Sequence, residues 1–466
     1  MKMNPSIEID NALVRKYHQL DSHYTTYPTA DRFIEAYDGK AHRLTLRQRN
    51  FMAGGATNNQ PLSLYVHLPF CETGCYFCDC HRVVSKDHGR AVSYLHFLQR
   101  EISLTAALLE GSRRVAEVHL GGGTPTFLTT AQLQALMAGL SENFDLQPGE
   151  YTIEIDPRTA DEEKIAALAA LGFNHMNFGV QDLAPAVQQA VNRVQTEAVT
   201  ARAITLARNY GVASINIDLM YGLPKQTVGG FEATLDRVLR WRPDRVALYG
   251  YTHSPSTYKL QRSIEVSELP SVAEKLAIVS HGIAKLSAAG YTYIGKDHFA
   301  LGHDALVAAT TQTGMQPSFQ DYANRPGGDL IGFGISAISR VGASYSQNVT
   351  TLDAYYDHLQ QNALPVLRGI ELSADDLVRR AVIQSLMRRF ELSIDAIEIA
   401  HLIRFNEYFA DEWERLEILE RDGLVTLATD WITVTAKGRL LVRAIARVFD
   451  RYLSQRESRQ HSPSVI

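Results

Sequence analysis

The stretch that decides the fold runs from an apolar segment into a group of thiols: Leu62-Ser-Leu-Tyr-Val-His-Leu-Pro-Phe-Cys71-Glu-Thr-Gly-Cys75-Tyr-Phe-Cys78-Asp-Cys80. It holds all four cysteines of the chain, so no thiol elsewhere is left to pair with them. A disulfide framework joins distant segments, whereas thiols crowded into one short loop are typical of a metal site in a reducing compartment. The stretch therefore predicts a strand that leads into a metal-binding loop.

The spacing C-x3-C-x2-C-x-C narrows the kind of metal site. A structural zinc usually takes two pairs of ligands from separate chain segments, which one loop cannot easily supply. Three thiolates at i, i+4 and i+7 can instead bind one cubane iron-sulfur cluster and leave its fourth iron open for another ligand. We favour the cluster, and a zinc ion or unligated thiols remain the alternatives.

Outward from this loop, short strand-like runs alternate with helical patterns, which is typical of βαβ units and a parallel sheet. Six runs are predicted strands: Leu62 to Leu68, Val115 to Leu120, Tyr151 to Asp156, His175 to Val180, Ala213 to Leu219 and Arg245 to Tyr251. Such a region forms either a doubly wound sheet or an incomplete (β/α)6 barrel. The helix and strand pattern alone does not separate the two.

Polar residues at the strand ends decide between these folds. Glu154 and Asp156 share one face of their strand, and Asn216 and Asp218 share one face of theirs. Active sites of parallel β/α folds lie beyond the carboxyl ends of the strands. A carboxylate-lined interior that faces one mouth favours the incomplete parallel barrel.

Helix signals lie between several of these strands. Apolar residues recur at helical spacing after Thr130, a candidate N-cap: Leu133, Leu136, Met137 and Leu140. Thr159 with Glu162 has the capping-box pattern, and that helix is predicted to stop at Gly172. A further helix is predicted over 272–288.

Three regions follow from these patterns. Residues 1–60 form an N-terminal arm, residues 61–365 the barrel with an extension, and residues 366–466 a mostly helical domain. In the last region, helices followed by a hairpin and a final helix resemble a winged helix. Four arginines at four-residue spacing are predicted to line one face of the final helix: Arg439, Arg443, Arg447 and Arg451.

The composition of the 466-residue chain, 45% hydrophobic and 21% charged, excludes collagen-like and wholly disordered classes. There is no apolar run of about 18 residues to span a membrane, and the N-terminus lacks the apolar core of a signal peptide. A net charge of -5 gives no general reason to expect nucleic acid as a partner. We expect a cytoplasmic globular protein that uses neither nucleic acid nor membrane.

The cysteine spacing after the first strand, with the Gly-rich turn after the second, resembles the radical S-adenosylmethionine superfamily. More closely, the chain is similar to the family of oxygen-independent coproporphyrinogen III oxidases from about Tyr24 to its C-terminus. The similarity rests on these motifs: Tyr65-Val-His-Leu-Pro-Phe-Cys71, Gly121-Gly-Gly-Thr-Pro-Thr126, Gly179-Val-Gln-Asp182, Asp218-Leu-Met-Tyr-Gly-Leu-Pro-Lys-Gln226, Asp297-His-Phe-Ala300 and Val434-Thr-Ala-Lys-Gly-Arg-Leu-Leu441.

The resemblance implies a [4Fe-4S] cluster bound by Cys71, Cys75 and Cys78, and two sites for S-adenosylmethionine. It assigns these residues to the first site: Tyr65, Gly122, Glu154 and Ile338. It assigns these to the second: Phe77, Gly123, Thr124, Gln181, Arg193, Asp218 and Thr252. Cys80 is implied to be a thiol that does not bind the cluster but matters for activity.

The resemblance also implies a reaction. A 5'-deoxyadenosyl radical would start the oxidative decarboxylation of two propionates of coproporphyrinogen III to vinyl groups, which gives protoporphyrinogen IX. The implied partners are this tetrapyrrole and a small electron-transfer protein as reductant, and we expect a monomer. A related haem chaperone or haem-degrading enzyme is one alternative, and a zinc-stabilised nucleic-acid-binding protein is another.

Several of these residues also have plainer interpretations. The glycines from Gly121 onward can be explained by a tight turn with no binding role. Arg193 can be a solvated surface residue, and Cys80 can be a small buried residue. The arginine stripe can be a solvated helix face or can bind an anionic substrate at the barrel mouth.

The chain departs from the family pattern at several positions, among them His23, Asp79, Lys296 and Asp321. The family pattern has Arg, Gly, Met and Gly there. These departures lie where we expect the substrate, so they put its identity in question more than the radical chemistry.

Overall fold

The computed structural model describes residues 10–17, 24, 26–49, 60–295, 297–307, 316–317, 322–323 and 328–453. The chain divides into two compact units, and each is described here by itself. The larger unit consists of Phe33–Ala289 with Gly328–Glu371, and the smaller unit of Met1–Arg32, Gly290–Gly327 and Leu372–Ile466.

The larger unit is built on one sheet, in which the six predicted strands are confirmed. They are β1 (Leu62–Leu68), β4 (Arg114–Gly122), β5 (Asp145–Ile155), β6 (His175–Gln181), β7 (Ser214–Tyr221) and β8 (Arg245–Gly250). These six strands pair in parallel in chain order. On its other side, β1 pairs in parallel with β13 (Leu330–Phe333). Beyond β13 follow β14 (Ile338–Val341), β15 (Ser344–Asn348) and β16 (Val366–Glu371), all antiparallel.

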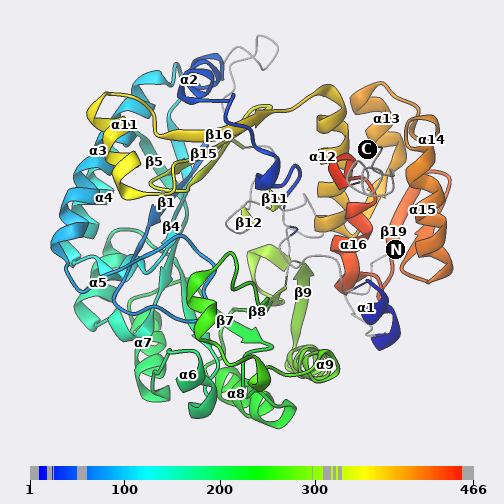
Figure 1. The fold of residues 1–466 in the computed structure, drawn as a ribbon, viewed down its shortest axis with the longest axis horizontal. Coiled ribbons are helices and arrows are strands. Elements are labelled where there is room, and N and C mark those ends of the chain that lie inside the picture. The colour runs from blue at the N-terminus through cyan, green and yellow to red at the C-terminus, as the bar shows by residue number, and fades with distance from the viewer. Residues whose placement is uncertain are drawn as a thin grey trace, which may run out of the picture. The chain divides into compact units, whose positions relative to one another are not determined.

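β1 pairs with β4 on one edge and with β13 on the other, so neither edge is left to pair with β8. The six βα strands therefore form an open, incomplete barrel, as predicted. Alternate side chains point to opposite faces of each strand. On β1, Leu64 and Val66 are buried on one face, whereas Tyr65 and His67 lie on the other. Helices surround the outer face of this sheet (Figure 1). The apolar core therefore lies between sheet and helices, and the inner face is polar.

The helices of the larger unit follow the strands. They are α2 (Gly39–Gln48), α3 (Gly89–Leu108), α4 (Thr130–Asn143), α5 (Glu162–Ala170), α6 (Pro185–Ala190), α7 (Glu197–Asn209), α8 (Val228–Arg240), α9 (Val272–Ala288) and α11 (Leu352–Gln360). The bounds predicted for α9 are confirmed. Two predicted caps are wrong. Thr129, not Thr130, accepts the Gln132 N–H at the start of α4, and Asp161, not Thr159, accepts the Lys164 N–H at the start of α5.

The smaller unit is mostly helical, as predicted. In its C-terminal part α12 (Ala374–Arg389), α13 (Ile394–His401), α14 (Phe405–Tyr408) and α15 (Ala410–Arg421) precede the hairpin of β18 (Val425–Leu427) and β19 (Trp431–Val434). The short β17 (Glu391–Ser393) pairs with β19, and α16 (Val442–Arg447) follows. The same unit contains α1 (Asn11–Tyr17) and the antiparallel pair β9 (Tyr291–Gly295) and β10 (His298–Leu301).

The arginine stripe of this unit is not a solvated helix face. Arg439 lies in a 3-10 turn, Arg439–Leu441, that comes before α16, so the predicted single helix is broken. Arg443 makes two hydrogen bonds to Asp297, of 2.8 and 3.2 Å. Arg451 contacts Asp375 and Asp376, whereas Arg439 and Arg447 lie over aromatic rings. These cations therefore have partners within the smaller unit, whereas their contact with an anionic substrate stays a prediction.

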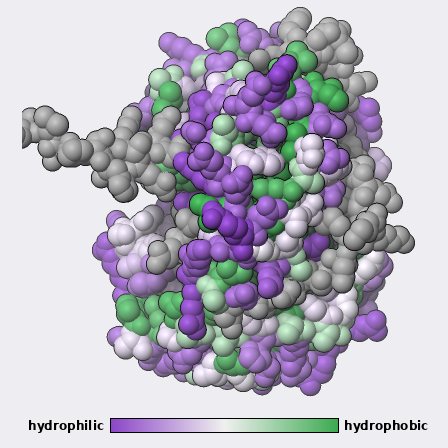
Figure 2. Space-filling view, turned by 90° about the vertical axis from the view of Figure 1, so that its right-hand side faces the viewer, coloured by the Kyte–Doolittle hydropathy of each residue, from purple (hydrophilic) through white to green (hydrophobic). Residues whose placement is uncertain are grey.

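The regions predicted for the chain, with boundaries at residues 60 and 365, stay a prediction. The described part of the arm is divided between the units: the Tyr27 hydroxyl donates to Asp376 at 3.0 Å in the smaller unit, whereas α2 belongs to the larger one. Among the residues that are coloured in Figure 2, hydrophilic ones are widespread, with apolar residues in small groups between them. Among the described residues, no helix is long and apolar enough to cross a membrane.

A buried ion pair fixes the edge of the sheet next to β1. Arg49 at the end of α2 and Asp329 just before β13 are only 4% and 6% exposed, and Arg49 Nε lies 2.6 Å from Asp329 Oδ2. The guanidinium also donates to the Ser112 and Gln60 carbonyl oxygens. The Asp329 carbonyl oxygen accepts the Ser63 N–H. This pair joins α2, β1 and β13.

We predict that Arg49→Met lowers the free energy of unfolding by about 3 to 5 kcal/mol, because the Asp329 charge stays buried without its partner. Urea titration followed by circular dichroism measures the change. Glu407→Gln is the control, since its pair with Arg404 is exposed on both sides. An equal loss in both variants would contradict the structural importance of the buried pair.

Candidate active site

A cavity of about 230 Å³ opens at the carboxyl ends of the parallel strands in the larger unit. Most of the residues predicted for the site line it: Cys71, Cys75, Phe77, Cys78, Cys80, Gly122, Gly123, Thr124, Glu154, Gln181, Arg193 and Asp218. Three predicted residues do not line this cavity, namely Tyr65, Thr252 and Ile338. Of the departures from the family pattern, Asp79 lines the cavity, whereas His23, Lys296 and Asp321 lie outside the described residues.

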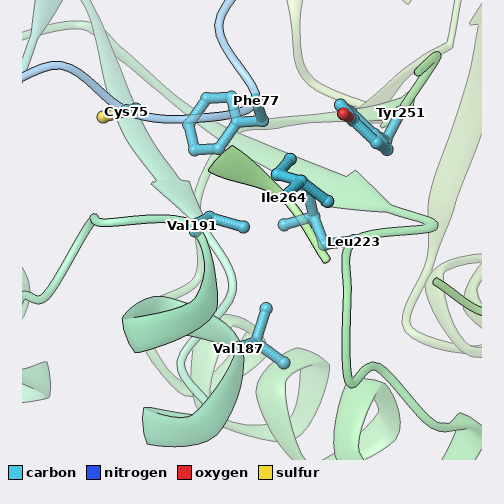
Figure 3. Close-up of a cluster of buried hydrophobic side chains, with 7 residues drawn as sticks. All are labelled: Cys75, Phe77, Val187, Val191, Leu223, Tyr251 and Ile264. Carbon is cyan, nitrogen blue, oxygen red and sulfur yellow. The ribbon is translucent and has the colours of Figure 1, made fainter. Parts of the chain in front are cut away.

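The cysteine loop is held in place by apolar packing. Phe77 lies in a buried cluster with Val187, Val191, Leu223, Tyr251 and Ile264, and Cys75 lies at its edge (Figure 3). The Tyr76 N–H donates to the Val191 carbonyl oxygen at 3.0 Å, and the Asn192 side chain donates to the Gly74 carbonyl oxygen at 3.0 Å. The loop after β1 is therefore fixed against the segment after β6, so its thiols face the cavity from a rigid support.

The four thiols have different environments. Burial raises the pKa of Cys71 to about 12. The sulfurs of Cys78 and Cys80 lie 3.0 Å apart, and donation from Cys80 lowers the pKa of Cys78, which the nearby Arg82 guanidinium lowers further. The same contact raises the pKa of Cys80. Cys78 is thus the thiol of this pair that favours the thiolate form, which is the form that binds metal.

Among the described residues, no three Cys, His, Asp or Glu side chains lie close enough together to hold one metal ion. A structural zinc takes four such ligands around a single ion. In a four-iron cluster each thiolate binds a different iron, and the sulfurs must stand apart.

The glycines at the end of β4 and just after it are required by close contacts. A Cβ at Gly121 would lie 2.6 Å from Glu154 Oε1, and one at Gly123 would lie 2.7 Å from the Pro69 backbone. Gly122 has a φ of +111°, a conformation that L side chains rarely adopt. Its N–H donates to Glu154 Oε2 at 3.0 Å. The glycines therefore do more than turn the chain, because they admit a carboxylate next to the backbone.

Two histidines that the sequence analysis did not include support the predicted residues. His119 Nε2 lies 3.2 Å from Glu154 Oε1, so Glu154 is held by both His119 and the Gly122 N–H. The Tyr65 hydroxyl lies 3.1 Å from His67 Nδ1, and burial lowers the pKa of His67 to about 4. His67 is two residues from Tyr65, and His119 is two residues from Gly121. Side chains two residues apart share one face of a strand, so this spacing could have predicted that both histidines lie on the inner face.

Arg193 is buried, at 8% exposure, so its interpretation as a solvated residue is wrong. It donates to Asp156 at 3.1 Å and to the Gly179 carbonyl oxygen at 2.6 Å, and its Nη1 lies 3.6 Å from Cys75 Sγ. Arg158, which the sequence analysis missed, donates to the same Asp156 at 2.6 Å. Burial opposes the Asp156 charge, but the two guanidiniums hold the pKa of Asp156 below its ordinary value.

The far wall of the cavity carries Gln181 and Asp218. Gln181 has a φ of +67°, a strained conformation that persists only where its surroundings hold it. Asn216 donates its amide to Asp218 Oδ1 at 2.7 Å, which orients that carboxylate. Three buried atoms of this region have no hydrogen-bond partner among the described residues: Gln181 Oε1, Arg193 Nε and Asn216 Oδ1.

Comparison with known proteins identifies the class. Residues 65–238 match the Radical SAM superfamily, and residues 372–441 match the HemN C-terminal domain. The fold, the cysteine loop and this match define a radical SAM protein.

Relatives that are similar over nearly the whole chain identify the family. The chain is 44% identical to oxygen-independent coproporphyrinogen III oxidase of Pseudomonas aeruginosa over 97% of both chains. It is 42% identical to the protein of that name from Escherichia coli over 99% of both. The solved structure of coproporphyrinogen III oxidase (HemN) from Escherichia coli matches with a TM-score of 0.90 at 41% identity, over 96% of this chain and 100% of that one. The chain belongs to the family of oxygen-independent coproporphyrinogen III oxidases.

We predict that Cys80→Ala shifts the alkylation of Cys78 to higher pH in the cluster-free protein. The donor that lowers the pKa of Cys78 is removed, so a smaller fraction of this thiol is ionised at a given pH. Iodoacetamide labelling at a series of pH values, followed by peptide mass spectrometry, gives the profile of Cys78. Cys71 in the same samples is the internal control, and an unshifted Cys78 profile would refute the assigned donor.

Proposed function

We propose that this protein carries out the oxygen-independent oxidative decarboxylation of two propionates of coproporphyrinogen III to vinyl groups, which gives protoporphyrinogen IX. The observation that carries the proposal is the similarity to relatives of that name over nearly the whole chain, through both units. A likeness to the Radical SAM domain alone would support only the radical chemistry.

The residues of the cavity suit a [4Fe-4S] cluster and S-adenosylmethionine. Its wall combines thiols with carboxylates, and among the described residues Gln181 Oε1 and Arg193 Nε are buried there without hydrogen-bond partners. Buried polar atoms without partners are rare, and a bound group is one explanation for them. When bound, the cluster would pass one electron from the reductant to S-adenosylmethionine and so supply a 5'-deoxyadenosyl radical for hydrogen abstraction from a propionate; loss of CO2 and one electron would complete the change to a vinyl group.

Each predicted residue then has a task that matches its chemistry. Cys71, Cys75 and Cys78 hold the cluster as thiolates. Glu154 and Asp218 accept hydrogen bonds from ammonium or hydroxyl groups, because ionised carboxylates only accept. Arg193 is suited to a carboxylate.

Two S-adenosylmethionine sites are proposed. The first uses Tyr65, Gly122, Glu154 and Ile338, and the second uses Phe77, Gly123, Thr124, Gln181, Arg193, Asp218 and Thr252. Phe77 lines the cavity and belongs to the buried apolar cluster on this side of it. Cys80 is proposed to act on Cys78 without binding the cluster.

The remaining partners are proposals of the same kind. We propose a small electron-transfer protein as reductant, a monomeric chain and a cytoplasmic location. A haem chaperone or haem-degrading enzyme of the same superfamily would share the cysteine loop but would not decarboxylate coproporphyrinogen.

We predict that protein reconstituted without oxygen converts coproporphyrinogen III to protoporphyrinogen IX when S-adenosylmethionine and a chemical reductant are supplied. Porphyrin chromatography after oxidation of the products measures both the mono- and the di-decarboxylated species. Protein without S-adenosylmethionine is the control. If S-adenosylmethionine is cleaved and no vinyl product forms, the substrate assignment fails and the radical chemistry stands.

We also predict that Cys71→Ala, Cys75→Ala and Cys78→Ala each lose the cluster, whereas Cys80→Ala keeps it, because three thiolates saturate three irons. Iron content and the visible absorption of anaerobically reconstituted protein measure the outcome. A normal cluster in Cys75→Ala would disprove the ligand assignment.

A further inference from the structure

A carboxylate lies buried in the larger unit, outside the cavity. Glu101, on α3, is 3% exposed and accepts three hydrogen bonds. Its Oε2 accepts the Gly334 N–H at 2.8 Å and the Tyr355 hydroxyl at 2.5 Å, and its Oε1 accepts the Asn348 amide at 2.6 Å. All three partners come from outside α3. Glu101 is therefore the point at which the β13–β14 turn, β15 and α11 meet α3.

The turn that Glu101 holds has an unusual backbone. Between β13 and β14, Gly334 has a φ of +93° and Ser336 a φ of +59°. A non-glycine residue at such a φ persists only when its surroundings hold it there. Besides Glu101, the Asn348 amide donates to the Gly334 carbonyl oxygen at 2.8 Å, and the Ile335 N–H donates to the Tyr94 hydroxyl at 3.2 Å.

This turn leads directly into the proposed first S-adenosylmethionine site. Ala337 packs in one buried cluster with Tyr65, and Ile338 follows it in the chain. From the other side, the Tyr94 hydroxyl donates at 2.7 Å to the carbonyl oxygen of His67, whose ring contacts Tyr65. The hydrogen bonds around Glu101 and Tyr94 therefore join both proposed walls of that site.

We propose that Glu101 is a positioning residue for S-adenosylmethionine, which sets the place of Ile338 by holding the Gly334–Ala337 turn. This inference rests on the proposed function, because it takes Tyr65 and Ile338 as residues of the first site. Burial raises the pKa of Glu101 to about 7, against the effect of its three donors. An apolar residue there would avoid this cost of burial but would leave three donors without an acceptor.

Glu101→Gln tests the role with almost no change of shape. The retained oxygen can still accept from Gly334 and Tyr355, but the new amide faces the amide of Asn348, so donor meets donor. If Asn348 turns to accept, the Gly334 carbonyl oxygen loses its donor. We expect the dissociation constant for S-adenosylmethionine to rise about tenfold in reconstituted protein. Iron content and kcat at saturating S-adenosylmethionine should stay within about twofold, because the variant loses binding and not chemistry.

A second readout needs no cofactor. Hydrogen exchange of the cluster-free protein, followed over residues 330–341, should become faster in Glu101→Gln than in the wild type. Ile102→Ala is the matched control, because Ile102 is the fully buried neighbour of Glu101 on α3 and offers the turn no hydrogen bond. It should lower the melting temperature while the affinity for S-adenosylmethionine stays unchanged.

The outcomes separate the two proposals. Wild-type protein that binds no S-adenosylmethionine would overturn the proposed function, and the positioning role with it. If the wild type binds and Glu101→Gln binds equally well, the positioning role alone is wrong. An equal loss of affinity in Ile102→Ala would also overturn it, because the effect would then follow general stability.

Discussion

The pairing of β1 with β4 on one side and β13 on the other decides where every side chain of the inner face lies. In this register Tyr65 stands opposite His119 and Gly332, and Gly122 stands opposite Leu68. A shift of one residue would turn the apolar side chains of β1 inward and its polar ones toward the helices. The cavity depends on this register, because polar residues line it from several strands at once.

A polar interior has to satisfy its own charges before any ligand arrives. Glu154 is held by His119 and a backbone N–H, and Asp156 is held by two guanidiniums. These contacts fix the carboxylates in single orientations, so binding does not have to order them.

The sequence was sufficient to predict the strands and most of the residues that line the cavity. Apolar alternation located the six strands, and the polar residues at their ends line the cavity. It was not sufficient for partners that meet only in space: Arg158 beside Asp156, or Glu101 beside Gly334. The cap at Thr130 was wrong by one residue because Thr129 and Thr130 are equally good caps by type. The arginine stripe was misread because regular spacing assumes one unbroken helix, and the 3-10 turn at Arg439 breaks it.

The place of β13 has a consequence for how the chain folds. Ser63 is paired with Leu330, so the sheet joins segments that lie far apart in the chain. Such long-range pairing is slow to form, because the intervening chain loses its freedom before the contact contributes. During synthesis the cysteine loop leaves the ribosome well before the strand that completes its sheet. The sheet around the cysteine loop therefore cannot be completed until β13 has been synthesised.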